Sequence, residues 1–287
     1  MEVLVAVPDT FSIPADKPEV KLVLVDLDGT LLDTQSHPTP QNLAALRALS
    51  ERGITCGIAS GRDVYSIEKL VDSWGAHDII DLVVGQNGSE VHQVSTGELK
   101  TGYLVDPEVF RRVIDHFADF DLNFCIAQKG IYQCYRDDRF VVNLEKIGRF
   151  EVGVDPEFKQ LLQSPQAKLH IMCEPALMPQ VIERAASLNE PEVQGVRTGP
   201  YLFEFQHPKV SKAVGIELAR ELLGLPSEAA VMAFGDAEND LEMIAAATVG
   251  VAMANACPAV KEVANYQTLD NNQSGVAVFL NQWFGLD

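Results

Sequence analysis

Positive charge is scarce in this sequence of 287 residues, in which 22 lysine and arginine residues stand against 41 aspartate and glutamate residues. The resulting formal net charge of −19 argues against nucleic acid or an anionic membrane as a partner, because both bind basic surfaces. An anionic substrate would meet an unfavourable overall field. The chain would then have to supply positive charge locally, through a divalent cation and a few placed basic side chains.

Cysteine is also scarce, and long hydrophobic runs are missing. The five cysteines are scattered, odd in number and without C-x-x-C spacing: Cys56, Cys125, Cys134, Cys173 and Cys257. This pattern favours reduced, mostly structural thiols over a disulfide framework or a zinc site. No apolar stretch is long enough to span a membrane, and the first residues lack the basic segment of a secretory signal. We therefore expect a cytoplasmic protein with neither nucleic acid nor membrane as a partner. The expected oligomeric state is a monomer or weak homo-oligomer.

Apolar runs and helical patterns alternate at both ends of the chain. Before residue 91, the predicted strands are 22–25, 54–59 and 81–84, and the predicted helices are 39–52 and 64–74. After residue 206 the alternation returns, with a helix over 211–223 and strands over 230–234 and 250–253. Alternation of this kind with short loops indicates an α/β fold with a doubly wound parallel sheet, a Rossmann-like core.

The pattern between about residues 91 and 205 is different. Short strands are predicted at 124–127, 131–135 and 169–172, and helices at 107–117 and 179–188. Such a mixed stretch is long enough to be a separate domain. We predict an α+β domain over 92–205, inserted into a core made of 21–91 and 206–287. Residues 1–20 form a predicted amino-terminal extension, in which 3–7 could add an edge strand.

The most informative motif is Asp26-Leu27-Asp28-Gly29-Thr30, which directly follows the first predicted strand. Two carboxylates in a core would be costly, since buried charges must be paired or bound to a metal. At the carboxyl end of a parallel strand they lie where open α/β sheets bind ligands. Gly29 permits a sharp turn there, and Thr30 adds a hydroxyl donor. The motif favours a catalytic loop over an ordinary acidic turn.

Two further motifs offer contacts for a phosphate group. Ser60-Gly61 ends the second predicted strand and precedes a helix, so a hydroxyl, a flexible glycine and a helix amino terminus come together. An N-cap serine beside a loop glycine is the simpler alternative. Lys212 opens a helix, where the helix dipole disfavours positive charge, which suggests a role for its ammonium group. A solvated surface lysine is the alternative there.

The last motif, Asp236-Ala237-Glu238-Asn239-Asp240, follows another apolar run. Three acids and an amide lie within these five positions, at the predicted carboxyl end of a strand. Hard oxygen ligands suit Mg²⁺, which takes one or two carboxylates together with waters and substrate phosphate. A solvated, acidic helix start is the alternative.

In order and spacing, the four motifs resemble the haloacid dehalogenase superfamily, whose members share D-x-D-G-T, a strand-end Ser or Thr, a helix lysine and a terminal acidic motif. The Gly-Asp-x-x-Asn-Asp form of the last motif is that of the Cof-like branch with a type IIB cap. Further matches to that branch are Gln86-Asn87-Gly88, 250–256 and 274–277. The resemblance covers about 21–280, and it implies that the inserted domain is the cap.

The resemblance also implies roles for the residues of the motifs. Asp26 is the expected nucleophile, which forms an aspartyl-phosphate, and Asp28 is the expected general acid and base. Mg²⁺ is the expected cofactor, held by Asp26, by Asp28 through its backbone carbonyl, and by Asp236, with Asp240 a ligand or a partner of one. The expected phosphate-binding residues are Gly29, Thr30, Ser60, Gly61, Lys212 and Asn239.

The function implied by the resemblance is that of a Mg²⁺-dependent phosphatase of small phosphorylated metabolites, sugar phosphates foremost. A dedicated sugar-phosphate phosphatase and a phosphomutase relative are alternatives within enzymes. A non-catalytic regulator that binds a phosphorylated metabolite is an alternative from another class. The presence of both Asp26 and Asp28 argues against the regulator, because binding alone needs neither a nucleophile nor an acid. Fold does not determine the substrate, which the sequence leaves open.

Overall fold

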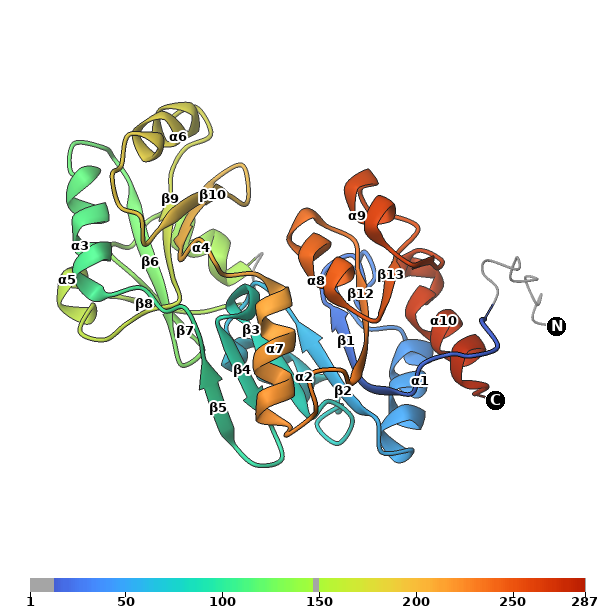
Figure 1. The fold of residues 1–287 in the computed structure, drawn as a ribbon. Helices are drawn as coiled ribbons and strands as arrows, with labels where there is room; N and C mark the ends of the chain where they lie inside the picture. Colours follow the sequence, from blue (N-terminus) through green and yellow to red (C-terminus); the bar gives the residue numbers. More distant parts are fainter. Residues whose placement is uncertain (1–12, 147–149, 287) are drawn as a thin grey trace. The chain divides into compact units, whose positions relative to one another are not determined.

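The computed structural model describes residues 13–146 and 150–286, which divide into two compact units, each with its own sheet (Figure 1). The first unit takes the described residues up to Gly61, then Ile67–Lys100 and the chain from Ser211 onward. The second unit takes Arg62–Ser66 and Thr101–Val210. The edge strand predicted at 3–7 lies outside the described residues.

The first unit, called the core below, is built on an eight-stranded sheet in the order β14-β13-β12-β1-β2-β3-β4-β5. Neighbouring strands from β14 to β3 are parallel, and β4 returns antiparallel to β3. The strands are β1 (Val20–Asp26), β2 (Thr55–Ala59), β3 (Leu82–Gly85), β4 (Glu90–Gln93), β5 (Glu98–Thr101), β12 (Ala230–Gly235), β13 (Val249–Ala252) and β14 (Tyr266–Gln267).

Helices connect and cover these strands, as a doubly wound sheet requires. The helix α1 begins at Pro40, where the hydroxyl of Thr39 accepts a hydrogen bond from the Asn42 amide at 3.2 Å. It packs against α10, while α7 contacts β3 and β4. The helices are α1 (Pro40–Glu51), α2 (Val64–Ser73), α7 (Lys212–Leu222), α8 (Leu241–Ala246), α9 (Pro258–Val263) and α10 (Gly275–Phe284), with short turns η1 (Gln86–Gly88), η2 (Glu238–Asp240) and η3 (Asn271–Gln273).

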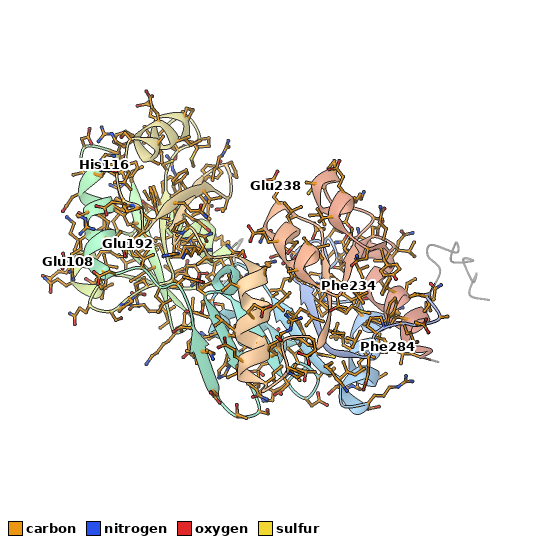
Figure 2. All side chains as sticks on the ribbon, viewed as in Figure 1. Glu108, His116, Glu192, Phe234, Glu238 and Phe284 are labelled. Carbon is orange, nitrogen blue, oxygen red and sulfur yellow. The ribbon has the colours of Figure 1, made fainter. Side chains whose placement is uncertain are left out.

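The central strands are buried on both faces, which explains their continuous apolar sequence. Leu22 to Val25 of β1 are fully buried. Phe234 of β12, which is labelled in Figure 2, packs edge-on against Phe279 of α10. In the sheet register, Asp26 lies beside Ala59 of β2, and Val25 lies beside Phe234. Three strands therefore end together at one edge, immediately before the predicted motifs.

The second unit, called the cap below, has a six-stranded sheet in the order β10-β11-β9-β6-β7-β8, antiparallel except for the parallel pair β7 and β8. An apolar cluster that includes Phe110, Phe117 and Phe205 joins helices and strands on one face. The elements are β6 (Asn123–Gln128), β7 (Ile131–Cys134), β8 (Glu151–Val154), β9 (Lys168–Met172), β10 (Gln194–Arg197), β11 (Leu202–Gln206), α3 (Pro107–His116), α4 (Arg139–Lys146), α5 (Phe158–Leu161) and α6 (Met178–Ala186).

The predicted fold class, a parallel α/β core with an inserted α+β domain, is confirmed. The units divide near Lys100 and Val210, whereas the sequence placed the insertion at 92–205. The difference arises because β4 and β5 continue the core sheet beside β3, whereas the predicted insertion begins at residue 92, within β4. All five cysteines are free thiols. In the described part of the chain, no helix combines the length and the apolar character that crossing a membrane requires.

Candidate active site

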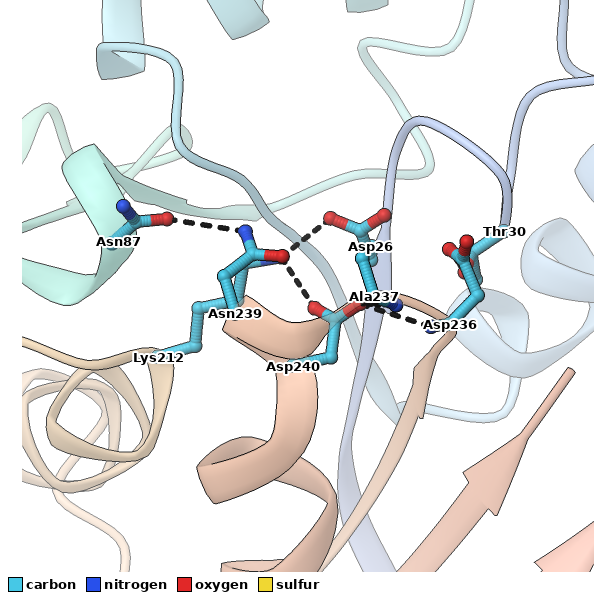
Figure 3. Close-up of polar contacts among 8 residues, drawn as sticks. All are labelled: Asp26, Thr30, Asn87, Lys212, Asp236, Ala237, Asn239 and Asp240. Carbon is cyan, nitrogen blue, oxygen red and sulfur yellow. Dashed lines mark hydrogen bonds and ion pairs between the residues drawn. The ribbon is translucent and has the colours of Figure 1, made fainter. Parts of the chain in front are cut away.

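The polar residues of the predicted motifs gather where β1 and β12 end (Figure 3). Asp26 is the last residue of β1, Lys212 is the first residue of α7, and Asp240 closes η2 just after β12. The Lys212 Nζ atom lies 2.5 Å from Asp26 Oδ1 and 2.5 Å from Asp240 Oδ1. Lys212 and Asp240 are completely buried, and Asp26 is 6% exposed. A lysine at a helix start is thus a buried bridge between two carboxylates.

Burial and the neighbouring charges together shift the pKa values of these side chains. Burial raises the pKa of Asp26 well above its usual value, and the neighbouring Asp240 raises it further, while Lys212 opposes both. The pKa of Lys212 is raised, because Asp26 and Asp240 together outweigh the effect of burial on the ammonium group. Lys212 is therefore held as a cation, and the carboxylates around it lack full compensation.

Asp240 organises the loop that follows β12. Its Oδ2 atom accepts hydrogen bonds from the backbone amides of Asp236 at 2.9 Å and Ala237 at 3.0 Å, while Oδ1 accepts from Lys212. A buried carboxylate with this many donors is well satisfied. These contacts make Asp240 an orienting residue for Lys212 and for the Asp236 loop.

Asp236 points its carboxylate toward the loop after β1. The Thr30 hydroxyl donates to Asp236 Oδ1 at 2.8 Å, and Asn255 Nδ2 donates to the Gly29 carbonyl at 2.8 Å. Gly29 has a φ of +87°, and a Cβ there would collide with the Asp236 carboxylate. Only glycine fits this close approach. Burial raises the pKa of Asp236, although the Thr30 hydrogen bond opposes that shift.

The donor set fits a hard divalent cation. One carboxylate oxygen from each of Asp26, Asp236 and Asp240 lies within 4.8 Å of the others. Lys212 is the cation that bridges two of them, so negative charge is in excess. In proteins, Mg²⁺ prefers oxygen ligands that carry negative charge.

The predicted phosphate-binding loop that follows β2 is hydrogen-bonded to the end of β3 and to the loop after it. The Ser60 amide donates to the Val84 carbonyl at 2.8 Å, and the Ser60 carbonyl accepts from the Asn87 amide at 3.0 Å. Asn239 is exposed, and its Nδ2 atom donates to Asn87 Oδ1 at 3.3 Å. Gly61 follows Ser60 in the same loop.

The predicted residues Asp28 and Thr30 lie in the loop after β1, and they differ in burial. Asp28 is exposed two residues beyond Asp26, and its charge contributes to the raised pKa of Asp236. Thr30 is completely buried, and its hydroxyl is directed to Asp236. Thr30 thus orients a carboxylate, where the sequence suggested contact with phosphate.

Two residues of this network, Asn87 and Asn255, are absent from the site set drawn from the sequence. Both lie in segments that match the Cof-like branch, Gln86-Asn87-Gly88 and 250–256. A single Asn in a loop carries no chemical signal of its own. Their contacts with Asn239 and with the Gly29 carbonyl appear only when distant loops are brought together.

Comparison with known proteins agrees with this geometry. Residues 23–280 match the family described as haloacid dehalogenase-like hydrolase. Over 274 residues, covering 90% of this chain and 96% of the relative, the chain is 30% identical to Bacillus subtilis YxeH, whose name ascribes phosphatase activity to it. It is 27% identical to B. subtilis YitU, a 5-amino-6-(5-phospho-D-ribitylamino)uracil phosphatase, with 92% and 98% of the two chains covered.

A solved structure gives the same result. A haloacid dehalogenase-like hydrolase from Bacteroides thetaiotaomicron superposes with a TM-score of 0.84 at 26% identity, covering 92% of this chain and 99% of that one. The chain belongs to the haloacid dehalogenase-like hydrolase family, as its motifs predicted. It is an enzyme of the phosphatase type within that family.

Proposed function

We propose that this protein is a Mg²⁺-dependent phosphatase of small phosphorylated metabolites, of the sugar-phosphate or phosphorylated-polyol class, that acts through an aspartyl-phosphate on Asp26. The observation that carries the proposal is the buried Asp26–Lys212–Asp240 bridge, with the Asp236 carboxylate within 4.8 Å. The name of YitU supports the substrate class, because its compound carries a phosphate on a ribityl chain.

Asp26 is the nucleophile in this proposal. Lys212 engages Oδ1, and we assign the attack to Oδ2. The bond from Oδ2 to phosphorus forms as the bond from phosphorus to the leaving oxygen breaks. Burial and Asp240 raise the pKa of Asp26 although Lys212 lowers it, which supports a role for further positive charge in keeping the carboxylate ionised.

Asp28 moves the protons. Its exposed position in the same loop suits a group that first donates a proton to the leaving oxygen and then takes one from water. The water oxygen attacks phosphorus, the acyl phosphate bond breaks, and Asp26 is regenerated with release of inorganic phosphate. Two carboxyl groups in different surroundings can divide these tasks, as one is buried beside Lys212 and the other is exposed.

The phosphoryl group is held by the surrounding loops. We assign its contacts to the Ser60 hydroxyl, the amides of Gly29 and Gly61, the Lys212 ammonium and the Asn239 side chain. Asp26, Asp236 and the backbone carbonyl of Asp28 would hold Mg²⁺, with Asp240 and Thr30 orienting them. When bound, the ion supplies charge neutralisation for the transferring phosphoryl group. Placed charge of this kind is the main requirement of phosphoryl transfer.

The compartment and partners follow the same proposal. Five free thiols suit a reducing compartment, so we place the enzyme in the cytoplasm. Its partner is a small phosphorylated metabolite, and the net charge of −19 disfavours nucleic acid.

The test is phosphate release from a panel of phosphorylated sugars, polyols, nucleotides and cofactors, with Mg²⁺ and with chelator, beside Asp26→Asn. We expect release that requires Mg²⁺, favours sugar or polyol phosphates and is lost in the variant. Release that persists in the variant would refute Asp26 as the nucleophile. Transfer to a second sugar hydroxyl would identify a phosphomutase, and tight Mg²⁺-dependent binding without release would identify a regulator.

A further inference from the structure

The segment from Gln86 to Ser89, which joins β3 to β4, has an unfavourable backbone. Gln86 has a φ of +50° and Asn87 a φ of +56°, so two consecutive residues with side chains lie in the left-handed region. This region is costly for residues with a Cβ, although Asn tolerates it better than most. Strain of this kind persists only where the surrounding structure imposes it, and it clusters at functional sites.

The same segment holds buried polar atoms that lack partners. Among the described residues, Gln86 Oε1 and Ser89 Oγ are buried without a hydrogen bond. Gln86 is 2% exposed and Ser89 is fully buried. Buried polar groups nearly always form hydrogen bonds, so these two atoms add a free-energy cost to that of the strained backbone. Backbone strain and unpaired buried polar atoms both lower stability, so local stability does not explain the conformation of this segment.

Contacts from this segment reach three motifs of the candidate site. The Asn87 amide donates to the Ser60 carbonyl at 3.0 Å, and Asn87 Oδ1 accepts from Asn239 Nδ2 at 3.3 Å (Figure 3). Gly88 packs so closely on the start of α7 that a Cβ there would collide with the Ser211 carbonyl oxygen. Ser211 precedes Lys212, so the turn touches the serine loop, the lysine helix and the acidic motif.

We propose that Asn87 is a positioning residue of the phosphate-binding site, which sets Asn239 through its side chain and the Ser60 loop through its backbone. The inference rests on the proposed function, because Ser60 and Asn239 are assigned there to the phosphoryl group. In its left-handed conformation, Asn87 contacts Asn239 through its side chain and the Ser60 carbonyl through its amide. These two contacts are our explanation for the strained backbone. Asn87 acts on the substrate through Asn239, so the effects of changing the two residues must be coupled.

The test is a double-mutant cycle with Asn87→Gly and Asn239→Ala, assayed with 4-nitrophenyl phosphate as a general phosphate ester. Glycine keeps the left-handed backbone and removes only the side chain. We expect Asn87→Gly to lower kcat/KM about tenfold, chiefly through KM, which is the effect of one hydrogen bond. Added to Asn239→Ala, it should have no further effect, because coupled residues are not additive.

Stability separates this role from a merely structural one. Asn87→Gly relieves a left-handed Asn and should keep or raise Tm, whereas Asn87→Ala retains the strain and should lower it. Wild-type kinetics in Asn87→Gly, or losses in the cycle that multiply, would overturn the inference. A wild-type protein that releases no phosphate from any ester would instead overturn the proposed function, and the two failures are therefore distinguishable.

Discussion

Each unit of the molecule buries a lysine, and the surroundings of the two lysines differ. Lys212 of the core is completely buried between the carboxylates of Asp26 and Asp240, each 2.5 Å from its Nζ atom. Lys168 of the cap is 3% exposed, and its Nζ atom lies 2.8 Å from Glu204 Oε2. His170 lies on the other oxygen of Glu204, with its Nδ1 atom at 3.3 Å.

The pKa values of Glu204 in the cap and Asp26 in the core are shifted in opposite directions. Burial alone would raise the pKa of Glu204, but Lys168 and then His170 hold it well below its usual value. Asp26 shows the opposite result, because burial and Asp240 outweigh Lys212 and raise its pKa. In the cap cluster, the Lys168 ammonium group balances the negative charge of Glu204. In the core cluster, the carboxylates carry more negative charge than Lys212 balances. Excess charge of this kind favours binding of a cation, and groups with shifted pKa values are typical of functional sites.

The largest expected effect that distinguishes the clusters is on catalysis. Asp26→Asn removes the proposed nucleophile and should lower kcat by about 10⁴-fold or more, as loss of a covalent nucleophile does. Stability should change by less than about 1 kcal/mol, because Lys212 keeps Asp240 and the replaced carboxylate is the one whose ionised form is disfavoured. Phosphate release and urea unfolding measure the two quantities. A large loss of stability would show that the core lysine needs both carboxylates.

The second effect is on stability and concerns the cap. Glu204→Gln leaves the Lys168 ammonium buried without its carboxylate and should lower the free energy of unfolding by about 3–5 kcal/mol. Urea unfolding followed by circular dichroism measures it. The matched control is Lys168→Met/Glu204→Leu, which removes both charges and should recover most of the loss. If Glu204→Gln cost no more than Asp26→Asn, the contrast between the clusters would be wrong.

The third effect is on metal affinity. Thr30 donates to Asp236 Oδ1 at 2.8 Å, so Thr30→Ala releases a carboxylate that is assigned to Mg²⁺. Loss of such a supporting hydrogen bond typically lowers metal affinity by about 10- to 100-fold. Activity as a function of Mg²⁺ concentration measures the shift. Thr34→Ala, on the exposed part of the same loop, is the control and should leave the Mg²⁺ dependence unchanged.

The smallest effect is on the acid dependence of stability. The folded pKa of Glu204 lies below its unfolded value, so its contribution is present above pH of about 4.3 and is lost as pH falls through the folded pKa. The difference in unfolding free energy between wild type and Glu204→Gln should narrow by at most about 1.4 kcal/mol for each pH unit below that value. Urea unfolding at several acidic pH values measures it. A constant difference would mean that Glu204 has an ordinary pKa.

Much of the core was predictable because periodicity and strand-end motifs carry local information. The apolar runs that became β1 and β12 predicted that Asp26 and Asp236 each follow the carboxyl end of a strand. That the two carboxylates lie together was implied by the family resemblance, and one oxygen of each lies within 4.8 Å of the other. The burial of Lys212 was not predictable, as its sequence also suits a surface lysine. The Lys168–Glu204 pair depends on the register between β9 and β11, which no motif marks. Strand pairing is equally unmarked in the sequence for β4 and β5, which explains why the predicted insertion began at residue 92, within β4.

The most direct test of the contrast between the two clusters is calorimetric titration of Mg²⁺ into the wild-type protein, Asp236→Asn and Glu204→Gln. The cluster of Asp26, Asp236 and Asp240 predicts saturable binding at a single site in the wild type, its loss in Asp236→Asn, and its retention in Glu204→Gln. Binding that is equal in wild type and Asp236→Asn, or absent from the wild type, would contradict the account.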